Sequence, residues 1–78
     1  MTITETSLSV FLAYASDADN WGGTPLVGGN VGGTTAERGN LTQLKQAGLI
    51  DTFKSDGETW VDFTDAGKAL AAEHGIKI

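Results

Sequence analysis

The chain has 78 residues, no cysteine and a formal charge of −5. A chain of this length buries only about 60 % of the surface that it exposes when unfolded, so we expect residues 1–78 to form a single domain with one compact core. The absence of cysteine excludes disulfides and thiolate metal sites, and no apolar run approaches the roughly 20 residues of a membrane span.

The charge is distributed unevenly along the chain. Residues 1–37 carry four acidic residues and no basic one, whereas residues 38–78 carry six acids and all five bases. Proteins gain affinity for nucleic acid by neutralising phosphates with Lys and Arg, so the net charge disfavours such a contact. Only the second half could supply the bases for it, namely Arg38, Lys45, Lys54, Lys68 and Lys77.

The first predicted element is a helix over residues 4–18. Thr4 is a suitable N-cap, and Val10 and Tyr14 widen the apolar surface beyond a single stripe. Such a helix lies centrally in the fold or presents its second face to another subunit, which makes Tyr14 a candidate for a partner interface. The stripe itself has helical spacing and consists of Leu8, Phe11, Leu12 and Ala15.

A turn and a short second helix are predicted next. Residues 17–24 are rich in Asp, Asn and Gly, which favour turns, and they include Trp21, a second candidate for a partner interface. Thr24 can cap a new helix and Pro25 suits its first position, where the missing N–H would be unsatisfied anyway. Because Gly28 and Gly29 follow at once, this helix is expected to span only residues 25–29.

The third predicted helix covers residues 35–47. Thr34 and Glu37 have the spacing of a capping box at its start. Gly48 fits the left-handed position that ends a helix, and Leu49 beyond it can contact Leu44 as in a Schellman motif. Gly39 inside the helix costs about 1 kcal/mol relative to Ala, which makes it a candidate for a close approach.

A β-hairpin over residues 49–63 follows, with its turn at residues 55–58. In its second strand Val61 and Phe63 share one face with Thr59, and Trp60 lies on the opposite face, where it is the third candidate for a partner interface.

A last helix is predicted over residues 65–74. Thr64 is its N-cap, Gly75 ends it, and its expected packing face consists of Ala66, Ala69 and Leu70. His74, the single histidine, suits the negative end of this helix. No carboxylate pair stands at a spacing suited to catalysis, so we expect no enzymatic activity and no metal or cofactor.

The motif order resembles the winged helix-turn-helix superfamily, in particular the MarR- and PadR-like regulators. The similarity rests on the string Leu44-x-x-x-Gly48-Leu49-Ile50, a Gly-centred turn, and Phe63-Thr64-x-x-Gly67, and it spans residues 24–70. It implies a small α+β winged helix-turn-helix fold with three to four helices and a two-stranded antiparallel hairpin wing, duplex DNA binding and, in many members, dimerisation. The chain departs from the pattern in the glycine-rich turn before residue 34 and in the acidic wing tip, Asp56 and Glu58.

Helical steps of 100° place a polar face of the third helix outward. Polar side chains there suit base edges and phosphates, although a face that is merely solvated has the same pattern. The expected base contacts are Thr35, Arg38, Thr42, Gln43 and Gln46, and the expected phosphate contacts are Thr34, Lys45, Lys54 and Ser55.

The leading hypothesis is a cytoplasmic, non-enzymatic protein that binds double-stranded DNA as a transcription regulator or as an accessory DNA protein of a mobile element. A homodimer through the first helix, the last helix or the Trp60 face is one expected assembly. The alternative is a winged-helix module with an acidic surface that binds a protein partner and no DNA. No membrane contact is expected, because the start of the chain lacks the basic region of a signal peptide.

Overall fold

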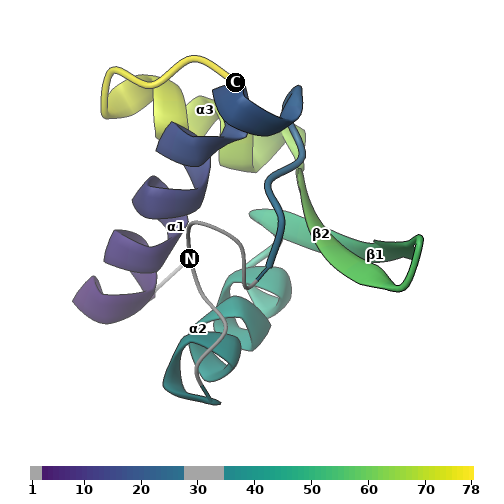
Figure 1. Cartoon of the computed structure of the whole chain (residues 1–78). Helices are drawn as coiled ribbons and strands as arrows, with labels where there is room; N and C mark the ends of the chain where they lie inside the picture. The colour runs from purple at the N-terminus through teal and green to yellow at the C-terminus, as the bar shows by residue number, and fades with distance from the viewer. Residues whose placement is uncertain (1–2, 28–34) are drawn as a thin grey trace.

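The computed structural model describes residues 3–27 and 35–78, with the side chains of residues 35–38 outside the description. It is a small α+β domain in which three helices pack together and a two-stranded antiparallel hairpin extends to one side (Figure 1), so the expected fold class is confirmed at this level. The elements in chain order are α1 (Glu5–Asp17), a 3-10 turn η1 (Ala18–Trp21), α2 (Thr35–Gln46), β1 (Ile50–Ser55), β2 (Glu58–Phe63) and α3 (Asp65–Glu73).

Helix α1 begins at the predicted cap, where the Thr4 hydroxyl accepts a hydrogen bond from the Ser7 amide at 3.1 Å. Of the predicted stripe, Phe11 and Ala15 are buried and Leu8 and Leu12 are half-buried, while Tyr14 is only 1 % exposed. The prediction that Tyr14 belongs to a partner interface is therefore wrong. The helix lies centrally, and its second apolar face is taken up by the protein's own core.

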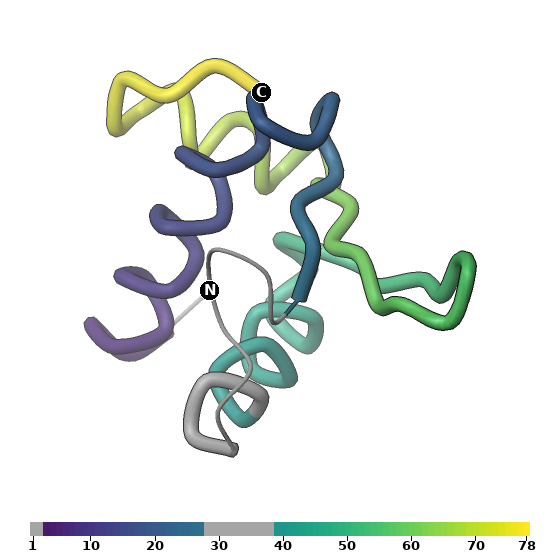
Figure 2. Tube along the Cα trace, in the orientation of Figure 1, coloured from purple at the N-terminus to yellow at the C-terminus, as the bar shows by residue number. Residues whose placement is uncertain are grey.

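Residues 25–27 are extended, so the helix predicted for residues 25–29 is wrong over the described part. Leu26 forms an antiparallel bridge with Trp60, and hydrogen bonds of 2.9 Å run from the Val27 amide to the Thr59 carbonyl and from the Val61 amide to the Pro25 carbonyl. The missing N–H of Pro25 suits this edge position as well as it suits a helix start, because only its carbonyl is used. Figure 2 traces this segment from η1 down to the hairpin.

Helix α2 ends as predicted. Gly48 has a φ of 77°, its amide donates to the Lys45 carbonyl at 3.0 Å, and the Leu49 amide donates to the Leu44 carbonyl at 3.1 Å. These two bonds define a Schellman motif. The capping box predicted at the other end involves Thr34 and the side chain of Glu37, both of which lie outside the description.

The hairpin follows directly, with Ile50 opposite Phe63 and Ser55 opposite Glu58. Asp56 and Gly57 both have positive φ, 53° and 78°, as the two central residues of a type I′ turn require. The hairpin and its turn are thus confirmed at the predicted positions.

Helix α3 starts at its predicted cap, since the Thr64 hydroxyl accepts from the Gly67 amide at 3.0 Å. Its packing face was predicted correctly only in part: Leu70 packs against the core, but Ala66 and Ala69 are exposed, and the buried residues are Gly67 and Ala71. The reason is that Gly67, which has no Cβ, lets the helix backbone rest directly on the Leu49 carbonyl. This contact turns the side of the helix that carries Gly67 and Ala71 toward the core and leaves Ala66 and Ala69 exposed.

The core lies between the three helices and the inner face of the hairpin. Phe11 and Phe63 meet edge to face with ring centroids 5.7 Å apart. Within the described ranges no helix has the length and apolar character needed to cross a membrane. The buried apolar residues are Phe11, Tyr14, Ala15, Ala18, Leu41, Leu44, Leu49, Ile50, Val61, Phe63 and Ala71.

Candidate nucleic-acid interface

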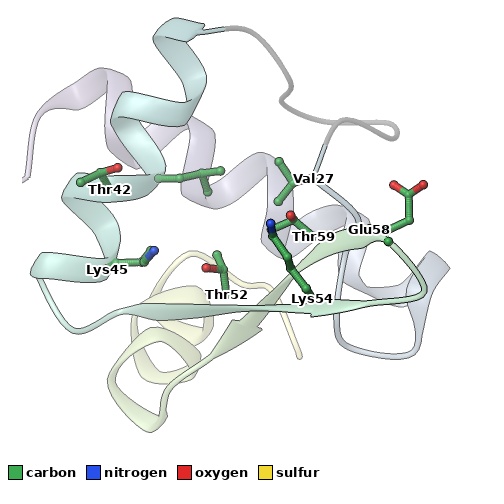
Figure 3. Close-up of a pocket in the computed structure, with 9 residues that line it drawn as sticks. Val27, Thr42, Lys45, Thr52, Lys54, Glu58 and Thr59 are labelled. Atoms are coloured by element: carbon green, nitrogen blue, oxygen red, sulfur yellow. The ribbon is translucent and has the colours of Figure 1, made fainter.

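A groove of about 480 Å³ separates α2 from the hairpin (Figure 3). One wall comes from α2, the other from β1 and β2, and Val27 closes one side. Its lining residues are Val27, Leu41, Thr42, Lys45, Thr52, Lys54, Gly57, Glu58 and Thr59.

The α2 wall follows from helical spacing. Leu41 and Leu44 anchor the helix in the core, and Thr42 and Lys45, three residues apart, stand beside each other next to that buried face. Both side chains are exposed at the groove. The helix that fills the core thus presents a polar edge to the hairpin.

The hairpin wall follows from strand alternation. Ile50, Thr52 and Lys54 lie on one face of β1 and go from buried through half-buried to exposed along the strand. The hairpin therefore continues beyond the core, and the outer part of its inner face forms the polar wall of the groove. On β2 the residue opposite Lys54 is Thr59.

Lys45 and Lys54 bring two ammonium groups from different elements to the same groove. Figure 3 shows both nitrogens turned toward the space between α2 and the hairpin. Among the side chains that the structure describes, no carboxylate forms an ion pair with either of them. Glu58 at the mouth is the one acidic residue in the lining, so the groove is locally positive within a chain of charge −5.

Two of the predicted contact residues make hydrogen bonds within the protein, Gln43 through its side chain and Ser55 through its main-chain carbonyl. The Gln43 side-chain oxygen accepts from the Thr4 amide at 3.1 Å and from the Thr4 hydroxyl at 3.3 Å, which directs this residue toward the start of α1. The Ser55 carbonyl accepts from the Trp60 indole N–H at 3.2 Å. Neither residue lines the groove.

Of the remaining predicted contact residues, some lie in the groove and others lie outside it or outside the described part of the chain. Thr42, Lys45 and Lys54 come together in the groove, and Gln46 is exposed on α2. Thr34 and the side chains of Thr35 and Arg38 fall in the part of the chain that is not described.

Thr59 was predicted to share the face of Val61 and Phe63, but neither it nor Thr52 was assigned to the contact surface. Both have the strand parity of Lys54 and Val61, so alternation alone could have placed them on the inner face. Glu58 was identified only as part of the acidic tip and also lines the groove.

The two tryptophans predicted for a partner interface contact each other. The rings of Trp21 and Trp60 meet edge to face at 5.6 Å with an interplanar angle of 68°. Both are half-buried, and Trp60 lies on the hairpin face opposite the groove.

The groove supplies ammonium and hydroxyl donors, the groups that contact phosphate oxygens. In residues 3–27 and 35–78, no three His, Cys, Asp or Glu side chains gather as a metal site would require. Comparison with protein families, curated proteins and solved structures found no match for this chain.

Proposed function

We propose that this chain is a winged-helix protein that binds duplex DNA, with α2 as the recognition helix and the β1–β2 hairpin as the wing. The observation that carries the proposal is the convergence of Lys45 and Lys54 on one groove between these two elements. Both lysines are exposed and were expected to contact phosphates from the sequence alone.

The geometry suits a duplex in the following way. A DNA major groove admits one α-helix, and the exposed Thr42 and Gln46 of α2 carry donors and acceptors that match base edges. The sugar-phosphate backbone of one DNA strand, which borders that major groove, then lies against the hairpin. There Lys54 and Lys45 neutralise its phosphates from two sides. Arg38 and Thr35 in the first turn of α2 are assigned to base contacts on their helix positions alone.

The net charge of −5 shapes the expected binding. Because the molecule as a whole repels phosphate, long-range attraction is weak and affinity depends on short contacts in the groove. We therefore expect low affinity for arbitrary DNA and pairing of two copies on a two-half-site target, as suits a transcription regulator or accessory DNA protein.

The proposal is tested by fluorescence anisotropy of labelled duplexes as a function of salt. The double variant Lys45→Gln/Lys54→Gln should bind more weakly than the parent, and its slope of log affinity against log salt should fall by about 2, because each lost phosphate contact removes about 0.9 from the slope. The measurement starts at about 50 mM salt, where non-specific binding is strongest.

The matched control is Lys68→Gln/Lys77→Gln, which removes the same charge from α3 and the C-terminal segment, away from α2 (Figure 1). The control should keep the parental slope. Equal losses in the two double variants would show that net charge alone governs binding and would exclude the groove as the site.

A further inference from the structure

An apolar row crosses the outer face of the hairpin, the face opposite the lysine groove. Phe53 stands opposite Trp60, and Trp60 is bridged on its other side by Leu26. Residues paired across antiparallel strands point to the same face, so Phe53, Trp60 and Leu26 form a continuous strip over three chain segments.

Trp21 completes this surface from η1. Its indole N–H donates to the buried carboxylate of Asp17 at 2.8 Å, and its ring meets the Trp60 ring edge to face. The Trp60 indole N–H is also used, in its bond to the Ser55 carbonyl. The two indoles are therefore fixed in place, and what they offer to another molecule is ring surface.

This aromatic strip is separate from the core. None of Trp21, Leu26, Phe53 and Trp60 belongs to the core cluster or to the half-buried residues that pack on it. Phe53 is 43 % exposed and is the one large apolar side chain that is exposed among the described residues. A hairpin face turned to solvent needs only polar residues, so an exposed Phe53 beside the half-buried Leu26, Trp60 and Trp21 indicates an interaction surface.

The charges beside the strip restrict what can cover it. Asp51 and Asp62 stand directly opposite each other on the same outer face, both exposed, and the arrangement of two like charges across strands is destabilising. Of the outer-face positions Asp51, Phe53, Trp60 and Asp62, the two that carry a charge are both acidic. A second copy of this face would bring the same carboxylates and a nucleic acid would bring phosphates, so both are repelled here.

We propose that the outer hairpin face, made of Leu26, Phe53, Trp60 and Trp21 with the carboxylates of Asp51 and Asp62, docks a segment of another protein that carries arginine beside aliphatic residues. A guanidinium can stack on the part of the Trp60 ring that reaches solvent and pair with a carboxylate through two parallel hydrogen bonds, while an aliphatic side chain covers Phe53 and Leu26. The rigid planar fork of arginine suits this combination better than the compact ammonium of lysine.

Intrinsic tryptophan fluorescence gives a direct readout, because the only two tryptophans of the chain are both in this surface. The probe is a capped peptide without aromatic residues in which arginines alternate with leucines. Its addition should change the emission in a saturable way, with affinity about tenfold weaker when lysine replaces arginine. A peptide with glutamate in place of arginine should leave the emission unchanged.

Two variants locate the site. Asp51→Asn/Asp62→Asn removes the repulsive pair without disturbing the strands, and it should weaken peptide binding about tenfold through loss of the charged acceptors. Phe53→Ser should weaken it comparably through lost apolar contact. The control Glu5→Gln/Glu73→Gln makes the same change in net charge on α1 and α3 and should bind like the parent.

Three outcomes would overturn the proposal. One is binding of the glutamate peptide as tightly as the arginine peptide. Another is an equal loss of affinity in the charge-matched control. The third is a fall in the solution mass of the protein on Phe53→Ser with no response to any peptide, which would assign the strip to a second copy of the chain.

Discussion

Gly67 and Gly39 both lie inside helices, but only one of them stands where a side chain would collide. A Cβ at Gly67 would overlap the carbonyl oxygen of Leu49, whereas a Cβ at Gly39 would have no neighbour within 4 Å among the residues that the structure describes. Gly39 was the helical glycine predicted to allow a close approach, and within the described part of the chain no close approach occurs there. Which helical glycine is crowded depends on how α3 crosses the end of α2, and no local pattern encodes that crossing.

We expect Gly67→Ala to lower the free energy of unfolding by about 2 kcal/mol, because α3 must move off the Leu49 backbone, as in other overpacked sites. Gly39→Ala should raise it by about 0.5 to 1 kcal/mol, because alanine favours the helix and meets open space. Urea unfolding followed by circular dichroism measures both. Similar changes in the two variants would contradict the contact between α3 and Leu49.

Tyr14 is a second residue whose surroundings could not be predicted from the sequence. Its residue type and helix position allow either a core or an interface location, and the structure places it in the core at 1 % exposure. The decision depends on α2 and the hairpin packing over α1, which are distant in the chain. By contrast, Thr4 and Thr64 were predicted correctly as caps because a cap bonds to a backbone amide three residues away.

At the scale of elements, Thr64 joins the end of α2 to the start of α3. Its hydroxyl donates to the Gly48 carbonyl at 2.6 Å and accepts from the Gly67 amide at 3.0 Å, and its amide donates to the Leu49 carbonyl at 3.2 Å. The hairpin lies between these two helices in sequence. Through its side chain and its amide, Thr64 thus ties together the two ends of the hairpin, where α2 ends and α3 begins.

Replacing Thr64 tests this junction. Thr64→Ala should cost about 1 to 2 kcal/mol in unfolding free energy, since it removes an N-cap, and Thr64→Ser should recover most of that loss because it keeps the hydroxyl. Thermal unfolding of the three proteins under one condition gives the comparison. A serine variant as unstable as the alanine variant would show that packing of the threonine methyl, and not the hydroxyl bonds, holds the junction.

The elements that were predicted correctly are specified by residues at their own ends and turns. Gly48 ends α2, Asp56 and Gly57 build the hairpin turn, and Gly75 ends α3, each with the positive φ that its position requires. The segment at Pro25 and Leu26 was predicted wrongly because its extended state depends on pairing with Trp60, a residue far along the chain. Proline at a first helical turn and proline at a sheet edge look alike in the sequence.

At the scale of the whole molecule, the hairpin separates two surfaces of different chemistry. Its inner face, with α2, holds the lysine groove, and its outer face holds the aromatic strip with Asp51 and Asp62. The chain of charge −5 can therefore present a locally positive site on one side while most of its acidity lies elsewhere. On this account one face contacts DNA and the opposite face remains open to a protein.

Part of the candidate site could be predicted from the sequence. Lys45 and Lys54 were assigned to phosphates from helix and strand positions, and they lie in one groove. The groove itself could not be predicted, because its width depends on how far the hairpin extends beyond Ile50 and on Val27 at its side. The separation of the tryptophans from the core likewise depends on the third chain segment that pairs with β2.

The most direct test is amide chemical-shift mapping of the isotope-labelled protein during titration with duplex DNA. If DNA binds in the groove, the largest shifts should occur at the amides that line or border it, those of Thr42, Lys45, Gln46, Thr52 and Lys54. The two indole N–H signals, which report the opposite face, and the amides of α3 should stay in place. Shifts concentrated on the indole signals or on α3, or no shifts at salt low enough for non-specific binding, would contradict binding in the groove.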